Sequence, residues 1–208
     1  MNFVNYCSGL NFRSIWIFYR LIQMAEAKYI TGNTTDDLWN QVSADLSGKN
    51  IYEYYALLVQ DERKVELIID IDLGGGFESG SAATSFTAAV TSTHDFRFAL
   101  HHQGLIDSAG KFFGMEDVVI GYKEFDDALI IKTNDRERTR RIFSDEEARR
   151  VFQSLRSFTL RLVHHHVADQ IEGQYSLELS IDEGITDPAT LRNLYVAFCI
   201  VLSGIEAN

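Results

Sequence analysis

The sequence predicts an α+β domain in which an antiparallel β-sheet of about six to seven strands is packed by helices and closed by a long C-terminal helix. Three observations support this prediction. About seven short segments alternate apolar and polar residues, as strands with one buried face do. Few helical patterns lie between these segments, so neighbouring strands are expected to pair antiparallel. A broad apolar face follows Pro188 and predicts a helix that covers the sheet.

The first half of the domain is expected to contain one helix and four strands. Residues 35–47 form a helix because a threonine and two aspartates begin it, apolar residues recur every four positions, and Gly48 ends it. The strands follow at residues 51–60, 65–72, 85–92 and 94–102. In the second of these strands, the odd positions are apolar and three of the even positions are acidic, which is typical of a strand with one solvated face.

The second half continues with three strands and two helices. The strands are expected at residues 128–133, 157–165 and 174–182. Ser144 begins a helix through a capping box, with an apolar face behind it. The last helix begins at Asp187–Pro188, where a capping aspartate precedes the helical position that best tolerates proline.

The two halves share an order of elements. YITGN is followed by a helix, a strand, a turn and VELIIDID, and IIKTND is followed by a helix, a strand, a turn and YSLELSID. This repetition suggests a duplicated β-α-β-β unit. The single proline and the lack of a Pro- or Ser-rich linker favour one domain over residues 24–208 rather than two independent ones.

Composition restricts the partners and the location. The chain has 208 residues, of which 46% are apolar, which is enough for a sizeable core. Its net charge of −11 disfavours nucleic acid and anionic membranes, because both are negatively charged. Cys7 and Cys199 lie at opposite ends in apolar surroundings and indicate no disulfide framework, so a cytoplasmic location is expected.

Residues 1–23 differ from the rest of the chain, since they contain none of its 30 acidic residues. Their apolar stretch 15–22 is shorter than the roughly 20 residues that span a bilayer, and Arg20 interrupts it. Three interpretations are open: an upstream extension with Met24 as the natural start, an amphipathic arm that docks on the domain, and a membrane contact. We favour the first, because MAEAKYI is typical of a cytosolic N-terminus.

The stretch LIIDIDLGGGFESGSAA at residues 67–83 raises the question of a phosphate-binding loop. The run Asp72–Gly76 resembles the second phosphate-binding loop of actin-like ATPases. Those folds need a much longer chain, and the hydroxyl residue usual after the third glycine is Phe77 here. No helix pattern and no Gly-Lys-Ser/Thr follows. We therefore interpret the stretch as a turn or loop between strands.

Three histidines are the candidates for a metal site. His102 continues the apolar face of one predicted strand, and His164 and His166 continue that of another. If the two strands were neighbours, the three imidazoles could converge as zinc ligands. Histidines at strand ends more often cap a core, so we expect no metal and no other cofactor.

Eight arginines between positions 136 and 161 reverse the local charge of an acidic chain. Arg138, Arg141, Arg149 and Arg150 are the candidates for a surface that binds an acidic or phosphorylated partner. The alternative, which we favour, is a solvated helix face on which Glu137 and the acidic run at 145–147 pair with the arginines.

Residues 121–155 contain Glu124-Phe125-Asp126 before a strand, then Asn134-Asp135, a short helix, and Phe143-Ser144 at the start of the next helix. This segment resembles one found in uncharacterised bacterial proteins that carry a domain of unknown function. The resemblance implies a bacterial protein, covers about a third of the chain when the following strands and helix are included, and supplies no catalytic residues.

The function expected from the sequence is that of a non-enzymatic interaction or regulatory module. No Gly-x-Ser-x-Gly, P-loop or dinucleotide motif is present, although a site assembled from distant residues would leave no linear trace. The many Tyr and Phe residues suit an interface with a protein partner or with a second copy. The alternative is a protein that binds a small apolar ligand in a cavity between the sheet and the C-terminal helix.

Overall fold

The computed structural model of the protein describes residues 27–48, 50–75, 79–90, 95–102, 115–165 and 174–207. Within these ranges, nine strands form one sheet, accompanied by five helices. The predicted α+β class is confirmed, and the predicted antiparallel sheet is confirmed except for one parallel pair, β1 with β2. The expected number of six to seven strands is wrong. The interpretations of residues 1–23 and of Met24 concern positions outside these ranges.

The strands are β1 (Lys28–Gly32), β2 (Glu53–Gln60), β3 (Arg63–Asp72), β4 (Ser81–Val90), β5 (Phe98–His102), β6 (Glu116–Asp117), β7 (Leu129–Thr133), β8 (Phe158–His165) and β9 (Gln174–Ile181). The helices are α2 (Thr35–Leu46), α3 (Lys123–Ala128), α4 (Arg136–Ile142), α5 (Glu146–Ser154) and α6 (Pro188–Glu206). The described strands lie in the order β1-β2-β3-β4-β9-β8-β5-β7-β6. β1 runs parallel to β2, and every other neighbouring pair among them is antiparallel.

β1 and β6 account for the difference in strand number. In β1 only Ile30 is buried, so the segment lacks the apolar alternation that identifies a strand. β6 consists of two exposed acidic residues, Glu116 and Asp117, and such a segment carries no strand signal. The short helix α3 is absent from the sequence prediction, and α4 enters it only as the short helix that the resemblance places after Asn134-Asp135. Polar residues dominate both helices, so neither shows an apolar periodicity.

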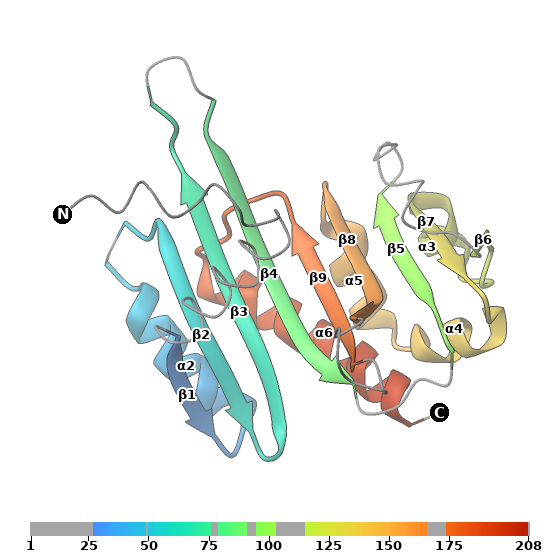
Figure 1. Cartoon of the computed structure of the whole chain (residues 1–208), viewed down its shortest axis with the longest axis horizontal. Helices are drawn as coiled ribbons and strands as arrows, with labels where there is room; N and C mark the ends of the chain where they lie inside the picture. Colours follow the sequence, from blue (N-terminus) through green and yellow to red (C-terminus); the bar gives the residue numbers. More distant parts are fainter. Residues whose placement is uncertain are drawn as a thin grey trace, which may run out of the picture.

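The helices lie on one face of the sheet, as the view in Figure 1 shows for α2, α5 and α6 behind the strands. Contacts of α4 with α6 and of α3 with α5 place the other two helices on the same side. Under the helices, the strands from β2 to β7 contribute one residue each to a row that crosses the sheet. The residues of this row are at most 2% exposed: Ala56, Leu67, Phe86, Leu179, Leu160, Leu100 and Ile131.

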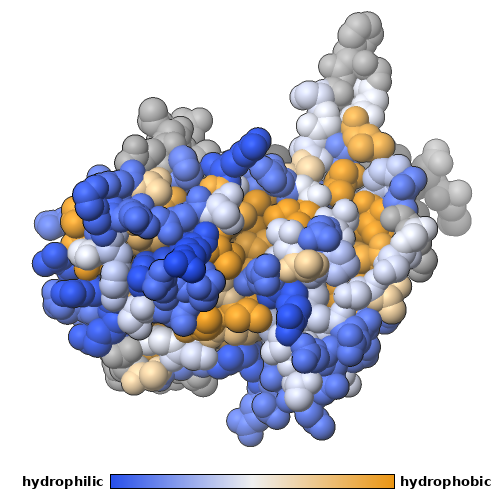
Figure 2. Space-filling view, turned by 180° about the vertical axis from the view of Figure 1, so that it is seen from behind, coloured by the Kyte–Doolittle hydropathy of each residue, from blue (hydrophilic) through white to orange (hydrophobic). Residues whose placement is uncertain are grey.

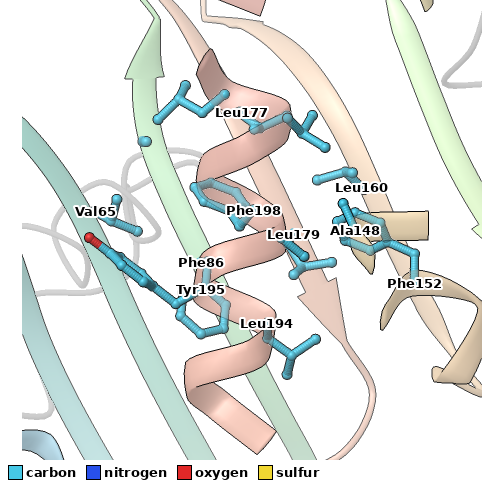
Figure 3. Close-up of a cluster of buried hydrophobic side chains, with 14 of the residues drawn as sticks. Val65, Phe86, Ala148, Phe152, Leu160, Leu177, Leu179, Leu194, Tyr195 and Phe198 are labelled. Atoms are coloured by element: carbon cyan, nitrogen blue, oxygen red, sulfur yellow. The ribbon is translucent and has the colours of Figure 1, made fainter. Parts of the chain in front are cut away.

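α6 begins as the sequence predicts. The Asp187 carboxylate accepts the backbone N–H of Thr190 at 2.8 Å, and Pro188 follows it in the first turn. The helix crosses behind strands of both halves of the sheet (Figure 1). Its buried residues are Leu191, Leu194, Tyr195, Ala197, Phe198, Val201, Leu202 and Ile205. The ring centre of Phe198 lies 6.0 Å from that of Phe86 in β4 (Figure 3).

Of the described helices, α6 alone is long and apolar enough to span a membrane by length and composition. Its apolar residues pack against the sheet and against α2, α4 and α5. This is the arrangement of a core helix in a folded domain, and a cytoplasmic location remains a prediction.

Aromatic rings fill the core behind β5 and β8. Phe143, between α4 and α5, lies 5.8 Å from Phe98, 5.4 Å from Phe125 and 6.2 Å from Phe152, measured between ring centres. Phe152 in turn lies 6.0 Å from Phe158 in β8. These rings join three helices to two strands, so the second half is held by aromatic contacts that stabilise beyond their buried area.

The repeated order of elements corresponds to two differently paired units. In the first, β1 lies directly beside β2, and α2 connects them. In the second, α4 and α5 connect β7 to β8, but β5 lies between these strands and is antiparallel to both. β7 and β8 therefore run in the same direction without touching, which is the split form of a β-α-β connection.

We expect Phe198→Ala to lower the free energy of unfolding by about 3–5 kcal/mol, because it removes a fully buried ring that packs across the sheet. Val196 lies on the same helix and is 39% exposed, so Val196→Ala should change the free energy by less than about 0.5 kcal/mol. Urea unfolding of both variants measures the difference. An equal loss of unfolding free energy in the two variants would contradict the assignment of the buried face of α6.

Candidate functional site

The glycine stretch connects two paired strands, as predicted. β3 and β4 form a hairpin in which Asp72 lies opposite Ser81, and the hairpin protrudes beyond its neighbours (Figure 1). Gly74 has a φ of +69°, and its N–H donates to the Asp72 carboxylate at 2.8 Å. A Cβ on Gly80 would lie 2.4 Å from the Asp72 carbonyl oxygen. The described glycines thus serve a tight turn and a close backbone approach.

The candidate metal ligands are not brought together. β5 and β8 are neighbours, which the zinc hypothesis required, but they pair antiparallel, with His101 opposite Thr159. This register places His102 at the start of β8, whereas His164 lies near its end, roughly 20 Å away along the strand. The His164 ring instead lies 4.5 Å from that of Tyr175. His166 is outside the described residues, among which no cluster of three potential ligands occurs.

Arg138 and Arg149 have structural roles within the fold. Arg138 is buried, donates to the carbonyl oxygen of Ile205 at 3.0 Å, and lies 4.3 Å above the Phe96 ring centre. Arg149 donates to the carbonyl oxygens of Phe143 and Ser144 at 2.6 and 2.8 Å. These contacts tie α6 to α4 and satisfy the carbonyls that follow α4.

The other two candidate arginines lie at the surface. Arg150 forms ion pairs with Glu146 and, at 2.7 Å, with Glu147 on the same helix, which is the pairing that the sequence favours. Arg141 is exposed at the end of α4. A partner that binds these two side chains stays a prediction.

A groove of about 1340 Å³ lies between α6 and the end of the sheet at the β2–β3 turn. Residues 60–64 of the β2–β3 turn, Ala89 of β4 and Thr35 of α2 line it, together with one side of α6. Arg63 ties the turn to the helix, since it donates to Ser203 Oγ at 2.8 Å and lies 3.7 Å from the Glu206 carboxylate. The surface on this side of the molecule shows hydrophobic residues between polar ones (Figure 2).

A thiol and a phenol line the groove, and their environment makes both less reactive. Burial raises the pKa of the Cys199 thiol, an effect that the nearby Arg63 only partly opposes. Burial also raises the pKa of Tyr195 far above its ordinary value. Both groups therefore stay protonated at neutral pH, which does not favour nucleophilic catalysis.

The face of the sheet opposite the helices carries no helix in the described ranges, and we call it the helix-free face. A continuous row of side chains crosses it, with one residue from each described strand. In spatial order from β1 to β6 these residues are Tyr29, Leu57, Glu66, Thr87, Glu178, Arg161, Ala99, Lys132 and Asp117.

Charge along this row is segregated. The acidic Glu66 and Glu178 belong to β3 and β9, whereas the basic Arg161 and Lys132 belong to β8 and β7. Arg161 and Glu178 are adjacent and form an ion pair at 3.2 Å. Lys132 pairs with Asp117 at the far edge. The helix-free face is therefore acidic towards β3 and basic towards β7 along its central row.

Partly exposed aliphatic side chains accompany the charges on this face. In the neighbouring row, Ile68 of β3 and Ile130 of β7 lie at equivalent heights, separated by Ser85, Ser180, Thr159 and His101. Both isoleucines are of intermediate exposure. Sequence reasoning missed this arrangement, because it depends on the order and register of strands distant in the chain. The available signal was an aliphatic residue at a predicted solvent-facing position, as at Ile68.

Comparisons of the chain with protein-family models, with curated proteins and with solved structures find no match. The resemblance of residues 121–155 to bacterial domains of unknown function stays a prediction. In the structure, the residues of that segment support the fold: the Asp126 carboxylate accepts the N–H groups of Ile120 and Gly121 at 2.9 and 2.8 Å. Asp135 caps α4, and Phe143 is fully buried.

Arg138→Ala should lower the free energy of unfolding by about 2–4 kcal/mol, because a buried charge-assisted hydrogen bond and a cation–π contact are lost together. Arg150→Ala, which removes exposed ion pairs, should cost less than about 0.5 kcal/mol. Chemical denaturation of both variants tests this. Wild-type stability of Arg138→Ala would disprove the structural role of that side chain.

Cys199 should react slowly with iodoacetamide in the folded protein, since only the thiolate is nucleophilic. In a Cys7→Ser background, where Cys199 is the only thiol, labelling at pH 8 should be at least about tenfold slower than in the urea-unfolded chain. Because folding raises this pKa, the thiol's contribution to stability is complete below its unfolded pKa and declines as pH rises above it. Equal labelling rates in the two states would refute the buried placement.

Proposed function

We propose that the chain is a non-enzymatic interaction module that presents the helix-free face of its sheet to another protein. The observation that carries this proposal is the central row, in which charges of both signs are ordered across the sheet beside half-exposed aliphatic residues. Interfaces combine apolar contact with complementary charges that select the partner and its orientation. A face that served only for solubility would need no such order.

The charged and reactive side chains outside the helix-free face also support a non-enzymatic function. Arg138 and Arg149 are engaged in the fold, and the thiol and phenol of the α6 groove stay protonated at neutral pH. The described residues offer no cluster that could hold a metal ion. The arginine-rich helices are therefore a weaker candidate for the partner surface than the sheet.

A second candidate function is the binding of a small apolar molecule, which the groove beside α6 favours. The sheet side of α6 is occupied by Phe86, Leu179 and Phe198, all fully buried (Figure 3). A ligand would therefore lie beside this filled region, in the groove between α6 and the β2–β3 turn, near Val196 and Ile200. Native mass spectrometry of the purified chain would distinguish this function, because it detects a retained small molecule.

A photoreactive amino acid placed at Ile68 should cross-link the chain to a polypeptide in the cells that naturally contain it, because Ile68 lies within the proposed contact. The same probe at Lys123, an exposed position on α3 on the helix side, serves as the matched control and should give no specific product. Cross-linking is read by denaturing electrophoresis and mass spectrometry. No product at Ile68, or equal products at both positions, would contradict the proposal.

A further inference from the structure

We infer that the partner on the helix-free face is a second copy of this chain, an inference that rests on the proposed use of that face. The pattern of the face is complementary to itself. Its central row reads acid, neutral, acid, base, neutral, base over β3, β4, β9, β8, β5 and β7. Within these six strands, reversing the order about the boundary between β9 and β8 exchanges each acid with a base. Beyond them, the reversal places Asp117 of β6 opposite Leu57 of β2.

A two-fold axis parallel to the strands at the β9–β8 boundary performs this reversal. It places Glu66 opposite Lys132 of the second copy and Glu178 opposite Arg161 of the second copy. By symmetry, each of these contacts occurs twice. The axis keeps the strands of the two sheets nearly aligned, which is the usual geometry of sheets packed face to face.

The same operation matches the neighbouring row. Ile68 and Ile130 occupy the β3 and β7 positions of that row, so the axis that pairs Glu66 with Lys132 also brings Ile68 over Ile130 of the second copy. Between them, Ser180 lies over Thr159 of the second copy, whereas His101, which would lie opposite Ser85, is buried within its own chain. A single two-fold axis therefore places charged residues opposite charged ones, polar opposite polar and apolar opposite apolar.

The distances suit the side chains involved. Sheets packed face to face lie about 10 Å apart, which a glutamate and a lysine or arginine can span from opposite sides. Arg161 and Glu178 already form a pair within one chain, so the second copy would extend that pair into a network. Charge complementarity of this kind fixes register and excludes other orientations, because they would oppose like charges.

Charge reversal in the full-length chain tests the inference. Glu66→Lys and Lys132→Glu should each raise the dimer Kd at least about tenfold, since each opposes like charges twice. The double variant restores opposite charges and should return the Kd to within about threefold of the original. Lys123→Glu on the helix side is the matched control and should leave the Kd unchanged. Sedimentation of each variant gives the Kd, and circular dichroism checks its folding.

A cross-linking test remains informative if a charge variant fails to fold. In a Cys7→Ser, Cys199→Ser background, chains with Ile68→Cys are mixed with chains carrying Ile130→Cys and treated with a short bis-maleimide, because sheets about 10 Å apart hold these positions too far apart for a direct disulfide. The axis predicts a mixed cross-linked dimer in preference to either symmetric one, because Ile68 faces Ile130 and not itself. A preference for a symmetric dimer, or no cross-linked dimer, overturns the inference.

The outcomes separate the two proposals. A chain that is monomeric at all concentrations, while Ile68 cross-links to a polypeptide of different mass, overturns the second copy and keeps the interaction module. A cross-link from Ile68 to residues 1–23 of the same chain overturns both, since the face is then covered from within. Dimers whose Kd responds to Glu66→Lys and Lys132→Glu, with recovery in the double variant, support both.

Discussion

The pairing of β4 with β9, covered by α6, is the contact on which the rest of the structure depends. It joins strands that are far apart in the sequence, and without it the sheet would divide into β1–β4 and a second half. Phe86 and Leu179 face each other across this pair, and Phe198 packs over Phe86. Because α6 also contacts α2, α4 and α5, its apolar face fixes the positions of three other helices relative to the sheet.

The elements that the sequence predicted well are those whose pattern is local. β3 alternates strictly, and α6 has a cap, a proline and a broad apolar face, so both follow from short-range rules. The helix expected at Ser144 has its N-cap one residue later, at Asp145, whose carboxylate accepts the N–H of Ala148. β1 and β6 could not be predicted, because pairing with a neighbour, and not their own composition, makes them strands.

Which side chains meet in the candidate site depends on the register between paired strands, and a single sequence does not reveal that register. The zinc hypothesis required β5 and β8 to be neighbours, and they are, yet their antiparallel register separates His102 from His164. The arginine run reads as a basic surface in the sequence, but Arg138 turns inwards against Phe96 and Ile205. Conversely, Glu66 and Lys132 show no relation in the sequence and become parts of one row only when nine strands are ordered.

The two edges of the sheet have a consequence for assembly. One edge is the two-residue strand β6, and the other is the five-residue β1, which carries the exposed Lys28. Short edges with a lysine are poor templates for the addition of further strands. Growth of the sheet from molecule to molecule, which leads to fibrils, is therefore discouraged at both ends. The contact proposed on the helix-free face would differ from such growth, because a contact related by two-fold symmetry closes on itself and stops.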